Sequence, residues 1–265
     1  MTREGDWFAD GAAYEHYVGR WSRGVGRLFL EWLSLPAGLR WVDVGCGTGA
    51  LTGAILEQAD PSQVIGIEPS VGFISLARDS IQDNRAEFRS GDAMSLPLKD
   101  AEADVSVSSL VLNFLSDQQL ALQEMRRVVQ PGGTVALYVW DYAGEMQLMH
   151  FFWNAVSDLF PDGAENDEGK QFPICQPEPL ADLFRAANLQ SVEVRPLDTP
   201  TDFVDFDDYW SPFLGGQGVA GSYCASLSED DRQRLRKHLE NTLPVQPDGS
   251  IHLIARAWAV RGVGK

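Results

Sequence analysis

The stretch Val42-Asp43-Val44-Gly45-Cys46-Gly47-Thr48-Gly49 decides the fold. A short apolar run at residues 39–44 leads into it, and Leu51, Ile55 and Leu56 follow at helical spacing. Glycines at the carboxyl end of a buried strand allow a tight turn and let a ligand lie against bare backbone. The first N–H groups of the following helix have no partner within the helix, so they can bind an anionic group. The stretch therefore predicts a strand, a ligand-binding turn and a helix.

Glu68 indicates what kind of ligand the turn holds. It ends the next predicted strand and follows Gly49 by 19 residues. A carboxylate at this place can accept hydrogen bonds from both hydroxyls of a ribose. With Ala50, the loop also satisfies the dinucleotide pattern G-x-G-x-x-G/A, so the glycines alone leave NAD(P) open. Asp43 favours another cofactor, because a carboxylate two residues before Gly45 repels a diphosphate and attracts an ammonium group.

Predicted strands and helices alternate through the first 140 residues and recur beyond them. Apolar runs predict strands at residues 39–44, 64–67, 86–89, 104–109, 134–140, 191–197 and 251–260. Helices are predicted between them, one capped by Ser70 and one by a capping box of Ser116 and Gln119. Strand and helix at this spacing imply parallel βαβ units. We therefore predict an α/β fold with a doubly wound, mostly parallel seven-stranded sheet.

The composition indicates a globular protein with reduced cysteines. Of 265 residues, 44% are apolar and 22% are charged, which excludes wholesale disorder. No apolar run approaches the roughly 20 residues that span a bilayer, and residues 1–30 contain no apolar signal-peptide core. Cys46, Cys175 and Cys224 are scattered, which favours a reducing compartment and offers no zinc site. We expect a cytoplasmic protein without a metal and without membrane insertion.

The distribution of charge indicates which classes of molecule the protein can bind. A formal net charge of −17 argues against nucleic acid, which requires clustered Lys and Arg. Residues 141–231 hold 18 acidic and 3 basic side chains, and the rest of the chain is nearly neutral. Such a stretch is either a solvated surface or the border of a substrate entrance that repels anions. We expect a small-molecule partner that is not strongly anionic, and the sequence leaves the oligomeric state open.

The order of the motifs resembles that of the class I SAM-dependent methyltransferases, where SAM is S-adenosyl-L-methionine. It resembles in particular the small-molecule, type 11 branch, which includes the ubiquinone and menaquinone C-methyltransferase-like proteins. The matching stretches, within residues 38–140, are VDVGCGTG at 42–49, IGIEPS at 65–70, GDA at 91–93, LP at 96–97, DVSVSSLVLNFL at 104–115 and RRVVQPGG at 126–133. The resemblance implies a Rossmann-like sheet whose last strand is antiparallel, with SAM as cofactor and S-adenosyl-L-homocysteine (SAH) as product.

The resemblance implies a set of cofactor-binding residues. They are Asp43, Gly45, Cys46, Gly47, Thr48, Gly49, Glu68, Pro69, Ser70, Gly91, Asp92, Ala93, Ser109, Leu110, Tyr17 and Arg20. The loop glycines line the methionine portion, Asp43 lies near its ammonium group, and Glu68 holds the ribose. Asp92 accepts from the adenine amino group, and the Ala93 N–H donates to the ring. The alternatives are that Asp92 only caps a turn and that backbone N–H groups hold Asp43.

The segment of residues 14–23 is expected to close over the sheet edge as a lid. Its Tyr17 would exclude water, and Arg20 or Arg23 would pair with the SAM carboxylate. The alternative is a surface helix whose aromatic residues pack in the core. The predicted organisation is a single domain, residues 1–265, with a helical cap at 1–38, a SAM-binding core at 39–140, and an acceptor-side half at 141–265 with an insertion at about 198–226.

Methyl transfer does not require a fixed catalytic residue, because the sulfonium donor is already activated. A general base depends on the pKa of the acceptor, and His150, His16 and Tyr142 are the candidates. A lone histidine is more often structural, so the catalytic residues stay unknown. Besides a small-molecule methyltransferase, two functions remain open. One is an NAD(P)-linked Rossmann oxidoreductase, which the missing Tyr-x-x-x-Lys pattern weakens, and the other is a non-catalytic SAM-binding protein.

Overall fold

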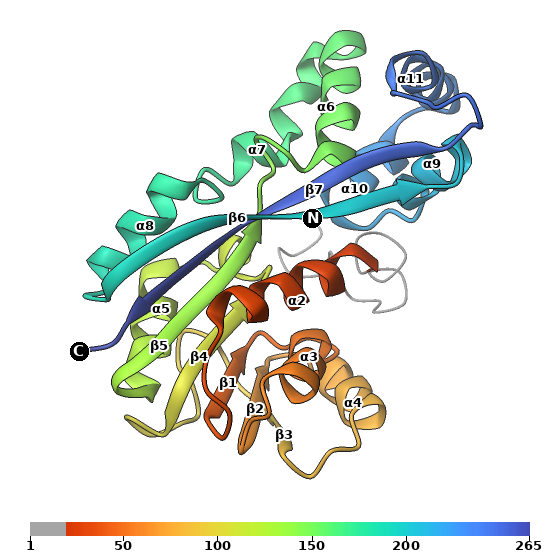
Figure 1. The fold of residues 1–265 in the computed structure, drawn as a ribbon. Coiled ribbons are helices and arrows are strands. Elements are labelled where there is room, and N and C mark those ends of the chain that lie inside the picture. The colour runs from red at the N-terminus through yellow and green to blue at the C-terminus, as the bar shows by residue number, and fades with distance from the viewer. Residues whose placement is uncertain (1–19) are drawn as a thin grey trace. The chain divides into compact units, whose positions relative to one another are not determined.

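The computed structural model describes residues 20–265 (Figure 1). The chain divides into two compact units. The first, called the core unit here, comprises Arg23–Trp140, Ile174–Leu197 and Ala257–Lys265. The second, called the helical unit, comprises Asp141–Pro173, Asp198–Arg256 and the described residues up to Ser22. The expectation of a single domain over the whole chain stays a prediction.

A single sheet of seven strands confirms the predicted fold class. Its order is β3-β2-β1-β4-β5-β7-β6. The strands are β1 (Arg40–Val44), β2 (Gln63–Glu68), β3 (Ala86–Ser90), β4 (Ala103–Ser109), β5 (Val129–Trp140), β6 (Gln190–Phe203) and β7 (Ile251–Val263). Neighbours from β3 to β5 pair in parallel, and β7 pairs antiparallel with β5. The strand order therefore reverses between β1 and β4, and ligands bind at such a switch point in doubly wound sheets.

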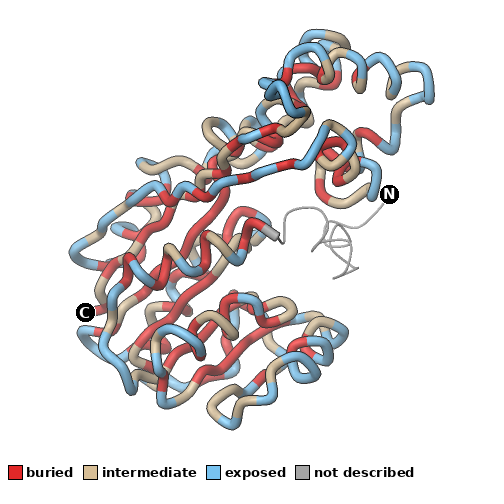
Figure 2. The backbone as a smooth tube through the Cα atoms, turned by 45° about the vertical axis from the view of Figure 1, so that its right-hand side comes forward, coloured by how far each residue is buried: buried red, intermediate tan, exposed pale blue. Residues whose placement is uncertain are grey.

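Helices cover both faces of the sheet in the core unit. They are α2 (Arg20–Leu33), α3 (Ala50–Gln58), α4 (Val71–Ser80), α5 (Gln118–Val128) and α8 (Pro177–Ala186). Figure 1 shows α3 and α4 on one face and α5 and α8 on the other, as right-handed crossovers require when the strand order reverses. Phe29 of α2 packs against Tyr138 of β5, with ring centroids 4.9 Å apart. The strands between these layers are the most buried part of this unit (Figure 2).

The helix caps confirm one sequence prediction and correct another. The Ser70 side chain accepts a hydrogen bond from the N–H of Phe73 and caps α4, as predicted. The capping box of Ser116 and Gln119 is wrong, because Asp117 is the N-cap of α5 and accepts from the N–H of Leu120 at 2.9 Å. A carboxylate at this position both satisfies an unpaired N–H group and interacts favourably with the helix dipole.

The helical unit is built around aromatic side chains. Its helices are α6 (Gln147–Leu159), α7 (Glu168–Gln171), α9 (Phe206–Leu214), α10 (Gly218–Ser226) and α11 (Glu229–Thr242), with a 3₁₀ helix η3 (Pro161–Asn166). Phe152 of α6 stacks on Phe213 of α9 at 4.4 Å between ring centroids, and Tyr209 donates its hydroxyl to the Leu148 carbonyl. Residues predicted as an aromatic insertion therefore include much of this unit's core.

Strand β6 is longer than predicted. The expected strand ended at residue 197, whereas β6 continues to Phe203 and takes up the first residues of the expected insertion. Leu197, Thr199, Thr201 and Phe203 are buried and alternate with exposed residues. The polar threonines and Pro200 hide this alternation in the sequence, because hydropathy assigns them to a loop. None of the helices between residues 20 and 265 has both the length and the apolar composition of a membrane span.

Candidate functional site

The glycine turn follows β1 and is fastened to β2. The N–H groups of Gly45 and Cys46 both donate to the Ile67 carbonyl, at 2.8 and 3.1 Å. Gly45 has a φ of 73°, and a Cβ there would lie 2.7 Å from Val111 Cγ2. Gly47 has a φ of 54°, and a Cβ there would meet no atom of the described residues 20–265 within 4 Å. The turn therefore needs glycine for its shape, and its backbone at Gly47 is open to a ligand.

Glu68 lies at the end of β2, beside this turn. Its Oε2 accepts from the Gly47 N–H at 3.1 Å, and its Oε1 accepts from the Ser70 N–H at 3.0 Å. The residue is only 8% exposed, and this burial raises the pKa of its carboxyl. Each carboxylate oxygen keeps a further lone pair. The two backbone donors thus fix a carboxylate that can accept further hydrogen bonds, as the ribose role requires.

Asp43 lies within β1 and is fully buried. Its Oδ2 accepts from the Thr52 hydroxyl of α3 at 2.7 Å. Its Oδ1 makes no hydrogen bond with any of the residues that the structure describes. Burial raises the pKa of Asp43 to about 7, Thr52 opposes this shift, and the nearby charge of Glu68 adds to it. Sequence reasoning missed Thr52, whose only signal was a hydroxyl on the first turn of the helix after the glycines.

The expected adenine segment begins at the end of β3. The Gly91 N–H donates to the Glu68 carbonyl at 3.2 Å, which brings this segment next to the end of β2. Asp92 is exposed, and its Oδ1 accepts from the Met94 N–H at 2.8 Å. Ala93 is buried, at 8% exposure. Asp92 therefore caps a turn with its own carboxylate, and the residue stays exposed.

Backbone strain marks the end of β4. Leu110 has a φ of 59°, a left-handed conformation that side chains other than glycine rarely adopt, and its N–H donates to the Tyr138 carbonyl at 2.9 Å. Such strain persists where the surrounding structure enforces it, often at binding sites. Ser109 precedes it and is half-buried. Asn113, which the sequence left without a role, is buried, and its Nδ2 lacks a hydrogen-bond partner among the described residues.

The remaining cofactor-binding candidates lie around the same strand ends. Thr48 and Gly49 complete the turn, and the Gly49 N–H donates to the Cys46 carbonyl at 2.8 Å. Cys46 is buried among apolar side chains, which raises the pKa of its thiol and indicates a packing role. Pro69 is exposed beside Glu68. The structure therefore brings the loop, Glu68 and Gly91 together at one edge of the core unit.

Two of the candidates for a general base belong to the helical unit. His150 is exposed on α6, and the Tyr142 ring packs against Phe172 at 5.7 Å, both in the helical unit. His16 and Tyr17 lie outside the described residues. Arg20 begins α2, and its side chain is not described. The roles of these residues as bases or lid residues stay predictions.

A further buried carboxyl group lies in the helical unit. Glu168 of α7 is 4% exposed. One of its oxygens accepts from Trp153 Nε1 of α6, and the other accepts from the Ala220 N–H of α10 at 3.4 Å. Burial raises its pKa to about 7. Both oxygens are bonded, so this group joins three helices.

The known proteins compared below are similar to this chain and are described as methyltransferases. The family profile described as Methyltransferase domain matches residues 42–137. A demethylmenaquinone methyltransferase of Geobacillus stearothermophilus is 28% identical over 193 residues, which cover 67% of this chain and 80% of that protein. A malonyl-[acyl-carrier protein] O-methyltransferase of Serratia marcescens is 33% identical over 134 residues, 51% of either chain. The match thus spans about half of that relative, and less than half of some others.

The fold is shared with solved structures. Phosphoethanolamine N-methyltransferase 2 of Haemonchus contortus, solved in complex with SAM, has a TM-score of 0.57 and 15% sequence identity. The superposition covers 91% of this chain and 52% of that one. At this identity the likeness concerns the fold alone.

Proposed function

We propose that this chain is a class I SAM-dependent methyltransferase that transfers a methyl group from SAM to a small-molecule acceptor. The open glycine turn between two buried carboxyl groups, Asp43 and Glu68, carries the proposal. SAM presents an ammonium group, a carboxylate and a ribose diol, and it has no phosphate that a neighbouring carboxylate would repel. This donor and acceptor set fits the turn better than a dinucleotide does.

The proposed placement follows the groups that the turn leaves unsatisfied. The open backbone at Gly47 takes the methionine portion, and Glu68 accepts from the ribose hydroxyls. Asp43 compensates the ammonium group, because its Oδ1 is a buried acceptor to which none of the described residues donates. Asp92 accepts from the adenine amino group, and Leu110, after β4, lies towards the sulfonium.

The chain's own contribution to catalysis is alignment and exclusion of water. SAM supplies an activated methyl group on its sulfonium, which the acceptor's nucleophilic atom takes by in-line displacement. The strained backbone at Leu110 and the pinned glycine turn hold their positions before any ligand binds, and such preorganisation can supply several kcal/mol of a barrier. No residue has to act as a base when the acceptor is already nucleophilic.

The acceptor is proposed to be a small molecule without strong negative charge. The acidic character of residues 141–231 and the name of one relative, demethylmenaquinone methyltransferase, support this class. The same charge disfavours nucleic acid. Three free, buried cysteines support a location in the reducing cytoplasm.

Turnover of SAM to SAH with a panel of phenols, quinols, amines and carboxylic acids tests the proposal. Glu68→Ala is expected to weaken SAM binding by about 1–3 kcal/mol, because a charged hydrogen-bond acceptor for the ribose is lost. Ser80→Ala, on the exposed side of α4, is the control and is expected to bind normally. Tight SAM binding without turnover of any acceptor would favour the non-catalytic alternative, and an unchanged affinity in Glu68→Ala would remove Glu68 from the site.

A further inference from the structure

The connection between β3 and β4 carries the expected adenine contacts and lies between regular elements. It comprises residues 91–102. We propose that Arg127, on α5, positions this connection, and with it Asp92 and Ala93, for binding the adenine of SAM. The inference rests on the proposed function, because it concerns how the same cofactor site is held. Arg127 is a positioning residue, since it acts through the connection and is not expected to touch the cofactor.

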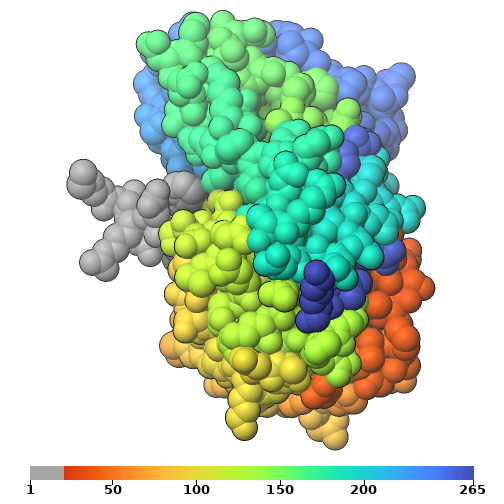
Figure 3. Space-filling model, turned by 90° about the vertical axis from the view of Figure 1, so that its left-hand side faces the viewer, coloured from red at the N-terminus to blue at the C-terminus, as the bar shows by residue number. Residues whose placement is uncertain are grey.

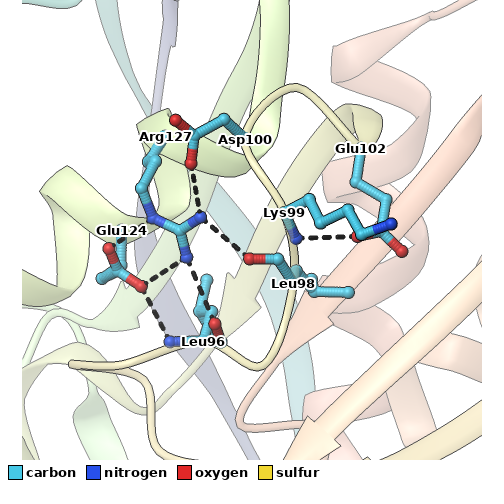
Figure 4. A network of polar contacts seen from close by, with 7 residues as sticks. All are labelled: Leu96, Leu98, Lys99, Asp100, Glu102, Glu124 and Arg127. Atoms are coloured by element: carbon cyan, nitrogen blue, oxygen red, sulfur yellow. Dashed lines mark hydrogen bonds and ion pairs between the residues drawn. The ribbon is translucent and has the colours of Figure 1, made fainter.

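The Arg127 guanidinium uses all five of its N–H donors (Figure 4). Two of them form a fork on the Glu124 carboxylate, at 2.6 and 2.7 Å. Two others reach the carbonyl oxygens of Leu98 and Leu96, at 2.8 and 3.2 Å. The fifth contact is to the Asp100 carboxylate at 2.8 Å. One side chain therefore ties α5 to three points of the connection.

Glu124 completes this clamp from the same helix. Its Oε2 accepts from the Leu96 N–H at 2.8 Å, so both backbone polar groups of Leu96 are held. The Asp100 side chain is 82% exposed and the Glu124 side chain is 16% exposed. Because exposed ion pairs contribute little, the Glu124 fork and the two carbonyl bonds carry most of the hold. The connection (yellow) and α5 (yellow-green) adjoin on the surface in Figure 3.

The hold on Leu96 reaches the adenine contacts through short-range packing. Pro97 lies directly behind Gly91, since a Cβ on Gly91 would come within 2.6 Å of Pro97 Cδ. Asp92 folds the chain back towards this anchor by accepting from the Met94 N–H at 2.8 Å. Asp92 is therefore held between two fixed points, Gly91 at the end of β3 and Leu96 in the clamp. Displacement of Leu96 is expected to move the Asp92 carboxylate.

The clamp needs a guanidinium and not merely a positive charge. A lysine ammonium offers three donors from one point, so it cannot grip a carboxylate with a fork and also reach two carbonyls. The neighbouring Arg126 differs in its contacts, because its Nε lacks a hydrogen-bond partner among the described residues. The two adjacent arginines thus form a matched pair with equal charge and different contacts.

The experiment compares Arg127→Met with Arg126→Met. SAH and its 6-oxo analogue, S-inosylhomocysteine, are titrated into each variant by calorimetry. Arg127→Met is expected to weaken SAH binding about tenfold, which is the size of effect that loss of a charged hydrogen-bonding group has. It is also expected to reduce the preference for SAH over the analogue. The preference falls because the misplaced Asp92 no longer accepts from the 6-amino group. Arg126→Met is expected to keep the wild-type affinity and preference.

Equal affinity and preference in the two variants would overturn the inference. A loss of affinity by the same factor for both ligands would also overturn it, because this indicates general destabilisation. Glu124→Gln weakens the fork and keeps Arg127, so it serves if Arg127→Met does not fold. It is expected to lower the preference in the same direction, and an unchanged preference contradicts the clamp. Wild-type protein that binds neither ligand would instead overturn the proposed function, on which the inference rests.

Discussion

Asp43 in the core unit and Glu168 in the helical unit are equally buried and differ in their partners. They are 0% and 4% exposed, and burial raises the pKa of each to about 7. Both oxygens of Glu168 accept hydrogen bonds, from Trp153 and Ala220. Asp43 is bonded to Thr52 through one oxygen, and its other oxygen has no partner within residues 20–265.

The difference shows that burial and a raised pKa do not by themselves mark a binding group. The bonds of Glu168 stay within the helical unit and join α6, α7 and α10, so its role is complete as architecture. Asp43 has one acceptor that no residue in the described part of the chain fills, and it lies beside the turn where a ligand is expected. A buried acceptor without a donor costs free energy, and a bound ammonium group removes that cost.

The largest expected effect concerns the stability that Glu168 contributes. Its pKa is higher in the folded than in the unfolded state, so this contribution is present below about pH 4.5 and is lost as the pH rises through about 7. When the pH rises from 5 to 8, the wild type loses this contribution to its unfolding free energy and Glu168→Gln has none to lose. The unfolding free energy of the variant minus that of the wild type is therefore expected to rise by about 3 kcal/mol. Urea denaturation at both pH values measures this difference.

Glu165→Gln is the matched control, because Glu165 is 82% exposed in the same unit. It makes the same change of charge and is expected to follow the wild-type pH dependence. If Glu168→Gln follows the wild type as well, the buried carboxyl of Glu168 is not the origin of the effect.

The next effect concerns cofactor affinity. Asp43→Asn is expected to weaken SAH binding by about 2 kcal/mol, because a neutral amide replaces the charged acceptor that the ammonium group requires. Calorimetric titration measures the affinity, and Glu168→Gln is the control that is expected to bind SAH normally. Equal losses in both variants would erase the distinction between the two buried carboxyl groups.

A smaller effect appears in the pH dependence of binding. The free protein holds a proton on Asp43 below about pH 7, and the ammonium group favours the ionised form. SAH affinity is therefore expected to rise about tenfold, or about 1.4 kcal/mol, from pH 6 to pH 8. Calorimetric titrations with SAH between pH 6 and pH 8 should show this rise in affinity for the wild type and for Glu168→Gln. The affinity of Asp43→Asn should not rise. A flat profile in the wild type would contradict the role of Asp43.

The smallest effect concerns the residue that holds Asp43. Thr52→Val keeps the shape and removes the hydroxyl that donates to Oδ2. This is expected to raise the pKa of Asp43 further and to weaken SAH binding at pH 7 by about 1 kcal/mol. Thr52→Ser keeps the donor and should restore most of the affinity. If valine and serine behave alike, the hydroxyl does not support the ionised carboxylate.

Sequence patterns predicted the fold and the identity of the strand-end residues, because these depend on local periodicity. The glycine turn, the Ser70 cap and the position of Glu68 at the end of β2 are where the sequence placed them. Patterns did not reveal the bond between Asp43 and Thr52, which forms only when α3 packs on β1. The same limit hid the contacts of Arg127 with backbone carbonyls, since a carbonyl carries no sequence signal.

Local competition explains the remaining differences. Ser116 and Asp117 are adjacent, and both residue types cap helices well. A shift of the helix start by one residue therefore changes the N-cap, which is Asp117 in α5. Thr199 and Thr201 are buried positions of β6, although hydropathy ranks them as polar. In both cases tertiary packing selects between local alternatives that the sequence leaves close in energy.

Calorimetric titration of the wild-type protein with SAH and with NAD⁺ at pH 6.5 tests whether the turn beside Asp43 selects an ammonium-bearing cofactor over a dinucleotide. Buffers of different ionisation enthalpy report the protons exchanged on binding. We expect SAH to bind with net release of protons, because the ammonium group favours ionised Asp43, and we expect NAD⁺ not to bind. Binding of NAD⁺ without binding of SAH would contradict both expectations.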